Sequence, residues 1–389
     1  MPAYTPDYIK YVDGTSATLG DGSIGDPWGL VQAVGFSVPG TRYMLLGDAT
    51  TPVAYSTSFL PGDTFQPGGG GTLLKRVEWI GCDDSWNPMP YPTVAIDGGD
   101  ADFDVATIDT AYNYFQGIQF QNNPSWSNKK GVSVTADRNV FVGCRASNCG
   151  SQGFYSNGIG VLFLGCEADL CNQTTTSTYS IRLYRNNVAD GCFVHDGGAA
   201  GIIFNDLFST ASRCIVARCS GGGIWASYGN AGYLAGDVNN SVIYDCGGYG
   251  IFLGHSTASP PLTVRNSIIA ANNGYGLAAH ATGKGTVNLV NSVVHGNSSG
   301  VSDANLFYHE MGDGLIIPAA GDIFEDPDND DFTVVNSALL AAGFPQRFLV
   351  DGVLGLQSYA DIGAMQAECT GGGGGLVAAP IGLRGGYIL

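Results

Sequence analysis

Short apolar stretches, each ended by a glycine or a polar turn, recur along the middle of the chain. The spacing is clearest at a set of reference positions, here called frame residues, that follow one another at intervals of 22 to 27 residues: Cys144, Cys166, Cys192, Cys214, Ser241, Ser267 and Ser292. A repeat of 20 to 30 residues is typical of a solenoid, in which each unit packs only on its neighbours. The sequence therefore predicts one long repeat array.

Three further columns share this spacing. Two residues after the frame stand small apolar residues (Ala146, Ala168, Val194, Val216, Ile243, Ile269, Val294), and five after it stand cysteine or asparagine (Cys149, Cys171, Cys219, Cys246, Asn272, Asn297). Nine after it stands glycine in five repeats (Gly153, Gly201, Gly223, Gly250, Gly276). The first column predicts the core, and the glycines predict a turn that needs unusual backbone angles or no side chain. The segments between turns are too short for helices, so we expect about three short strands in each coil.

Residues 240–251 (NSVIYDCGGYGI) and 266–277 (NSIIAANNGYGL) resemble the right-handed parallel β-helix, pectate-lyase-like superfamily. The resemblance covers roughly residues 10 to 366. It implies an all-β protein: a right-handed parallel β-helix solenoid with a short N-terminal capping helix and a C-terminal assembly tail. In the cap we expect a helix with Asp26 at its N-cap and Pro27 in its first turn, and with Trp28, Val31 and Val34 closing the end of the solenoid.

The predicted organisation has four parts. Residues 1–75 form the cap and entry segment, 76–310 the β-helix, 311–369 a closing segment, and 370–389 a tail. The tail has five consecutive glycines at 371–375, followed by an apolar peptide. Its apolar side chains would be exposed in isolation, so we expect them to dock on another subunit: Leu376, Ile381, Leu383, Tyr387, Ile388 and Leu389.

The overall charge excludes some partners. Acidic residues outnumber basic ones 34 to 16, and the net charge of −18 repels nucleic acid and anionic membranes. We find neither a signal peptide at the N-terminus nor an apolar run long enough to span a membrane. Ten cysteines in 389 residues are too sparse for a disulfide scaffold. Because their two columns cannot converge on one point, we expect stacked thiols with no metal.

Charged residues lie four positions after the frame in three successive repeats: Asp196, Arg218 and Asp245. Resemblance to β-helix polysaccharide lyases implies that Asp196 and Asp245 could hold Ca²⁺ and that Arg218 or the adjacent His195 could remove a proton. The alternative, which the sequence favours, is a structural ion-pair ladder. A hydrolase would instead need paired carboxylates across a groove, for which Asp169, Asp196 and Asp206 are candidates.

Two other groups of residues suggest ligands. Five aromatic residues near coil corners are candidates for stacking on sugars, or for ordinary packing: Trp225, Tyr228, Tyr233, Tyr249 and Tyr275. The run at 325–331 (EDPDNDD) holds five carboxylates, of which Asp326, Asp328 and Asp330 could bind calcium. A solvated turn is the more ordinary interpretation of such a run. We expect no other cofactor.

The absence of an export signal and the apolar tail together predict a structural protein of a bacteriophage virion, such as a tailspike, fibre or capsid-decorating β-helix. It would be made in the host cytoplasm, form a homo-oligomer, dock to other virion subunits through its tail, and be able to bind a host-surface glycan. The alternative is a carbohydrate-active enzyme, a polysaccharide lyase or depolymerase of the pectate-lyase-like superfamily. A surface adhesin is the second alternative.

Overall fold

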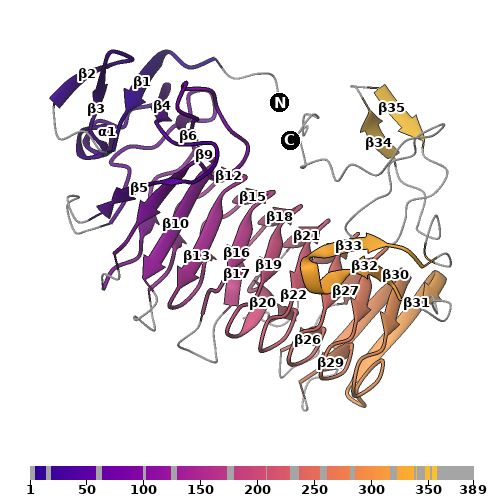
Figure 1. Ribbon diagram of the computed structural model, residues 1–389. Helices are drawn as coiled ribbons and strands as arrows, with labels where there is room; N and C mark the ends of the chain where they lie inside the picture. The colour runs from indigo at the N-terminus through magenta and orange to yellow at the C-terminus, as the bar shows by residue number, and fades with distance from the viewer. Residues whose placement is uncertain are drawn as a thin grey trace.

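The computed structural model shows one elongated stack of β-coils (Figure 1). It describes residues 5–14, 19–57, 64–99, 102–123, 129–172, 179–206, 208–227, 236–254, 261–280, 285–315, 322–336, 339, 347–350 and 353–356. Strands stack in parallel on three faces, here called sheets A, B and C. The all-β, right-handed parallel β-helix expected from the sequence is confirmed.

Sheet A contains β1 (Tyr8–Val12), β2 (Leu19–Ser23), β3 (Asp26–Trp28), β4 (Thr41–Leu45), β6 (Val77–Gly81), β9 (Asn113–Gln116), β12 (Val140–Val142), β15 (Leu162–Leu164), β18 (Val188–Asp190), β21 (Thr210–Ser212), β24 (Asp237–Asn239), β27 (Leu262–Arg265), β30 (Gly285–His295) and β31 (Leu306–Leu315). Sheet B contains β5 (Val53–Ser56), β7 (Val94–Asp97), β10 (Ile118–Asn123), β13 (Arg145–Cys149), β16 (Glu167–Asp169), β19 (Phe193–His195), β22 (Ile215–Ala217), β25 (Val242–Tyr244), β28 (Ile268–Ala270) and the second half of β30. Sheet C contains β8 (Ala106–Ile108), β11 (Val132–Val134), β14 (Phe154–Ser156), β17 (Tyr179–Leu183), β20 (Ala200–Phe204), β23 (Ile224–Ala226), β26 (Ile251–Leu253) and β29 (Leu277–Ala279).

Outside these sheets lie one helix, α1 (Leu30–Gly35), and two antiparallel pairs. The first pair is β32 (Phe324–Asp326) and β33 (Asp331–Val334), joined by the 3-10 turn η3 (Pro327–Asn329). The second pair is β34 (Arg347–Val350) and β35 (Val353–Leu356).

The core column predicted from the sequence is confirmed by the strand register. Ala146 pairs with Ala168, and the pairing continues through Val194, Val216, Ile243 and Ile269 to Val294. The frame residues stack as well: Ser241 and Ser267 each accept a hydrogen bond from the backbone N–H one coil before. The described cysteines are free thiols, and burial raises the pKa of the Cys166 thiol.

A second interior column, on sheet A, was not predicted. It begins with aromatic rings and becomes aliphatic: Tyr43, Trp79, Phe115, Phe141, Phe163, Ala189, Ala211, Val238, Val264 and Leu289. In the two coils where sheet A contributes Phe141 and Phe163, sheet B contributes the small Ala146 and Ala168. In the next coil, sheet A contributes the smaller Ala189 and sheet B the larger Val194. In these coils a smaller side chain on one sheet accompanies a larger one on the other, which favours close packing.

The glycine column is explained by packing rather than by unusual backbone angles. A Cβ on Gly250 would lie 2.4 Å from Cγ2 of Ile269 and 2.7 Å from the carbonyl oxygen of Gly276. Gly223 faces Ile243 in the same way, at 2.2 Å. Because glycine has no side chain, the backbone at this turn can pack directly on the interior column of sheet B.

The capping helix exists but begins later than predicted. Asp26, Pro27 and Trp28 form strand β3, whose backbone pairs with β1 and β2, so these residues cannot begin a helix. Gly29 is the N-cap, and Leu30 begins the helix. Trp28 and Val34 pack against the core as expected, but Val31 is 47% exposed and does not close the end.

The predicted tail lies outside the described residues, and the division of the chain at residues 75, 310 and 369 stays a prediction. In the described part of the chain, no helix has the length and apolar character needed to cross a membrane.

Candidate functional site on the outer face of sheet B

The outward side chains of sheet B change character halfway along the solenoid. From β7 to β16 they are mostly polar or charged: Asp97, Gln119, Gln121, Arg145, Ser147, Glu167 and Asp169. From β19 onward the matching positions are mostly apolar: Phe193, Ile215, Ala217, Val242, Tyr244, Ile268, Ala270 and Val293. We call these the polar half and the apolar half of sheet B.

Contacts within the polar half connect successive coils. Arg145 donates to both oxygens of Asp169 at 2.8 and 2.9 Å, and Ser147 Oγ donates to the same carboxylate at 3.0 Å. Nε of Arg145 also lies 3.4 Å from Oε1 of Glu167. Gln121 donates to Asp97 at 3.0 Å. This face therefore presents an ordered row of hydrogen-bonding groups.

His195 and its neighbours form a network at the boundary between the two halves. Nδ1 of His195 lies 2.6 Å from Asp196, Nε2 lies 3.1 Å from Glu167, and the ring stacks on Phe193. Burial by itself would lower the pKa of His195, but the hydrogen bonds to Glu167 and Asp196 outweigh it and raise the pKa. With both ring nitrogens engaged, His195 is poorly placed to remove a proton from a substrate.

This network makes stability depend on pH. A raised His195 pKa stabilises the fold below the ordinary value of 6.5, and this contribution is lost as the pH rises through the raised pKa. We expect the melting-temperature difference between the native chain and His195→Gln to be larger near pH ~5.5 than near pH ~9. The exposed His309→Gln is the control; an equal difference for His195→Gln at both pH values would contradict the expectation.

Arg218 is the next member of the network. Its Nε and NH2 donate to the two oxygens of Asp196 at 3.0 and 3.2 Å. Partial burial alone would raise the pKa of Asp196, but hydrogen bonds from Arg218 and His195 lower it. Asp245 is not among the groups that Arg218 binds, so only the first half of the expected Asp-Arg-Asp ladder forms. The paired carboxylate suggested for a hydrolase is also not formed, since Asp206 pairs with Arg185 instead.

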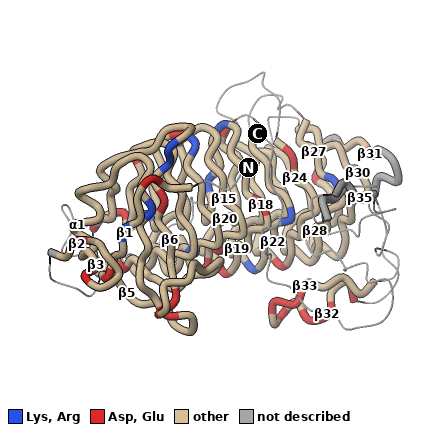
Figure 2. The backbone as a smooth tube through the Cα atoms, turned by 90° about the horizontal axis from the view of Figure 1, so that it is seen from above, with Lys and Arg blue, Asp and Glu red and all other residues tan. Residues whose placement is uncertain are grey.

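The apolar half of sheet B is covered by the β32–β33 hairpin (residues 322–336). Phe324, Phe332 and Val334, together with Leu339, pack on Ala217, Val242, Ile268, Ala270 and Val293. The rings of Phe324 and Phe332 contact Tyr244 edge-on at 5.5 and 5.8 Å. Figure 2 shows acidic residues gathered along this hairpin.

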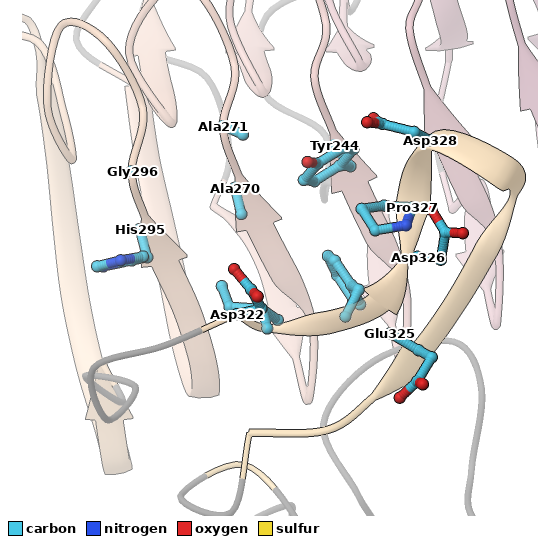
Figure 3. Close-up of a pocket in the computed structure, with 12 residues that line it drawn as sticks. Tyr244, Ala270, Ala271, His295, Gly296, Asp322, Glu325, Asp326, Pro327 and Asp328 are labelled. Carbon is cyan, nitrogen blue, oxygen red and sulfur yellow. The ribbon is translucent and has the colours of Figure 1, made fainter.

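An open pocket of about 380 Å³ lies between the hairpin and sheet B. Sheet B and its turns contribute Tyr244, Ala270, Ala271, His295 and Gly296; the hairpin contributes residues 322–328. Figure 3 shows Asp328 and Asp322 on two sides of Tyr244, whereas Glu325 points away from it. We call this the Tyr244 pocket.

Three carboxylates lie close enough to Tyr244 to raise the pKa of its hydroxyl. Burial raises the pKa of the Tyr244 hydroxyl, and Asp245, Asp328 and Asp322 raise it further. The pKa of Asp245 is itself raised, first by partial burial and then by the nearby Asp328 carboxylate. Asp245, a carboxyl with a raised pKa, thus lies close enough to Asp328 of the pocket lining to feel its charge.

The suggested calcium ligands do not come together. Asp330 pairs with Arg218 at 2.6 Å, Asp326 accepts a hydrogen bond from Asn329, and Asp328 lines the Tyr244 pocket. Asp196 is likewise bound by Arg218 and His195. Within the described residues, no three His, Cys, Asp or Glu side chains are grouped as metal ligands. The site therefore does not fit the calcium chemistry that the lyase resemblance implies.

Two of the aromatic candidates share a cluster on sheet C. Trp225 contacts Phe252 edge-on at 5.2 Å, and Tyr249 stacks on the same Phe252 ring at 5.1 Å. Tyr275 stands one coil further along. Tyr228 and Tyr233 lie outside the described residues, as do the six docking residues of the tail.

The Tyr244 pocket itself was not predicted. A signal was present, because the positions one and three after the frame are mostly apolar from Phe193 onward, although they face outward. Apolar residues on the outside of five successive coils require a cover.

Comparison with known proteins supports the fold. A family model described as "Right handed beta helix region" matches residues 103–237 and 236–306. A crystal structure of pectate lyase Pel9A superposes with a TM-score of 0.67 at 16% identity, over 93% of this chain and 97% of that one. A rhamnogalacturonan lyase gives 0.48 at 15% identity over 72% and 74% of the two chains. The lacto-N-biosidase from Eubacterium ramulus gives 0.45 at 10% over 79% and 66%. At 16% identity, the likeness to the pectate lyase shows a shared fold alone. No curated protein matches the sequence.

Proposed function

Because this chain belongs to the right-handed β-helix family, whose model matches more than half of its 389 residues, we propose that it is a carbohydrate-active protein that hydrolyses a glycan at the Tyr244 pocket. The observation that carries the proposal is an open pocket lined by Asp328 and three other carboxylates, next to which burial and the Asp328 carboxylate raise the pKa of Asp245. The shared fold with a pectate lyase supports a carbohydrate as the ligand class.

Hydrolysis suits the pocket better than elimination. Elimination on a uronate requires positive charge to offset the sugar carboxylate, yet the twelve residues that line the pocket include no Lys or Arg. Four of the twelve are acidic, so an anionic glycan would be repelled. The pocket therefore favours a neutral glycan or an amino sugar.

The two carboxyl groups would have complementary roles. Protonated Asp245 would donate its proton to the glycosidic oxygen as the bond from that oxygen to the anomeric carbon breaks. A water molecule would add to the anomeric carbon and pass its proton to the carboxylate of Asp328 as the general base. Tyr244, which keeps its own proton, would donate a hydrogen bond to a sugar hydroxyl.

The test is release of reducing ends from a panel of neutral, amino-sugar and uronate glycans. We expect the native chain to cleave a member of the first two classes and Asp328→Asn to lose that activity. Asp26→Asn, which removes an exposed carboxylate from β3 at the far end of the chain, is the control. Failure of the native chain to cleave any glycan, or full activity of Asp328→Asn, would overturn the proposal.

A bacteriophage virion is the second proposal for where the protein works, and it rests on the glycine tether and apolar peptide of residues 370–389. A glycan-cleaving β-helix is compatible with such a location, since a virion component can act on a host surface; a surface adhesin is the remaining alternative. Deletion from Gly371 onward should leave a folded solenoid that no longer enters its particle or oligomer. Normal incorporation of the truncated chain would contradict this.

A further inference from the structure

The hairpin forms a separate unit on the outside of the solenoid. Its apolar contacts with sheet B make a cluster that shares no residue with the interior core. Phe332 of the hairpin belongs to this cluster and is fully buried. The outward apolar side chains of sheet B that it covers lie outside the interior core. Docking of the hairpin therefore removes an apolar surface that the coils themselves cannot cover.

Arg218 joins the hairpin to the solenoid. Besides binding Asp196, its guanidinium donates to the carbonyl oxygen of Pro327 at 3.3 Å and to Asp330 Oδ1 at 2.6 Å. Both acceptors belong to the turn of the hairpin. Asp196 is in turn bound by His195, and His195 by Glu167, so the position of Arg218 is determined from the polar half of sheet B. One side chain thus connects the His195 network to the hairpin.

The pocket depends on this attachment. Residues 322–328 supply every acidic side chain that lines it, while sheet B supplies Tyr244 and His295. Arg218 binds Pro327, which lies within this segment, and Asp330, which follows it. A hairpin that leaves sheet B takes Asp322 and Asp328 away from Tyr244.

We propose that Arg218 is a positioning residue that holds the β32–β33 hairpin on sheet B and so creates the Tyr244 pocket. The hairpin is then a detachable cover, and the solenoid without it has no such site. This inference concerns the site of the proposed function, but hairpin docking is measured without substrate. A failure of this inference can therefore be distinguished from a failure of the proposed glycan-cleaving activity.

Arg213 offers a matched control. Like Arg218, it has a φ of 52° and donates through Nε and NH2 to an aspartate in the preceding coil, here Asp190. None of these contacts involves the hairpin. Replacing either arginine by alanine removes a similar ladder pair at the same backbone conformation, and only Arg218→Ala removes the contacts with Pro327 and Asp330.

The experiment is hydrogen exchange of the full chain, followed by mass spectrometry of peptides covering residues 322–336 and strands β22, β25 and β28. We expect Arg218→Ala to speed exchange in the hairpin at least ~10-fold while the strands stay protected, because the hairpin opens locally. Arg218→Lys, which keeps one positive charge, should restore part of the protection, and Arg213→Ala should leave the hairpin unchanged. Binding of an apolar dye should rise only in Arg218→Ala.

Unchanged hairpin exchange in Arg218→Ala would overturn the inference, as would an equal effect from Arg213→Ala. If Arg218→Ala does not fold, Asp330→Asn removes the same ion pair from the hairpin side and leaves sheet B intact. Native-like protection of residues 322–336 in Asp330→Asn would then also count against it. With a cleavable glycan, partial recovery of kcat/KM in Arg218→Lys relative to Arg218→Ala would support the positioning role, and equal values would oppose it.

Discussion

Phe141→Ala should lower the free energy of unfolding by about 3–5 kcal/mol, the usual cost of emptying an aromatic position in a core. Phe141 is fully buried, and its ring stacks between Phe115 at 4.8 Å and Phe163 at 5.3 Å. The opposite position in sheet B is Ala146, which is too small to fill the gap. Denaturant unfolding followed by circular dichroism measures the change.

Tyr8→Ala serves as the control, because its side chain is 62% exposed and its loss should change stability by less than ~0.5 kcal/mol. A cost below about 1 kcal/mol for Phe141→Ala would mean that the aromatic column is not closely packed. The distinction bears on the whole N-terminal half of the solenoid, since Trp79 and Phe163 belong to the same column.

Asp245→Asn should lower glycan cleavage by about 10²- to 10⁴-fold, the range that general acid catalysis contributes. The amide has no acidic proton to give to the leaving oxygen. The native chain should lose activity as the pH rises through the raised pKa of Asp245, because the acid must be protonated. Steady-state rates measured across pH on the glycan identified from the panel provide the test.

The pH profile also separates Asp245 from a structural carboxylate. Where residual activity of Asp328→Asn can be measured, its alkaline limb should move to lower pH, because the charge that helps to raise the Asp245 pKa is gone. Asp237→Asn, which removes an exposed partner of Arg265 on sheet A, should alter neither rate nor profile. An alkaline limb that stays in place in Asp328→Asn would show that Asp245 is not the acid.

The sequence was most informative where a contact joins the same position of neighbouring coils. Ala146 and Val216 could be placed in one column because each coil repeats the geometry of the last, so a fixed spacing along the chain becomes a fixed spacing in space. The aromatic column of sheet A was missed, although it obeys the same rule. Its residue type changes from Phe163 to Ala189, so no single residue type marks the column along the sequence.

The capping helix shows the limit of local signals. Asp26 and Pro27 are favourable at a helix start, yet pairing of β3 with β1 and β2 placed them in a strand. Pairing of β3 with β1 and β2 outweighed the helix-start preference of Asp26 and Pro27, and the helix begins after this strand, at Leu30.

By itself, the sequence determined the solenoid, the interior column of sheet B and the stacking of Asp196 with Arg218, because all of these follow from one repeat. Only the tertiary structure decided that the acidic run at 325–331 returns to sheet B, that Asp330 binds Arg218, and that Asp328 faces Tyr244. These contacts join residues about 85 to 110 positions apart that share no repeat, and no spacing encodes them. They form because sheet B presents apolar side chains outward, and burying that surface under Phe324 and Phe332 stabilises one position of the hairpin.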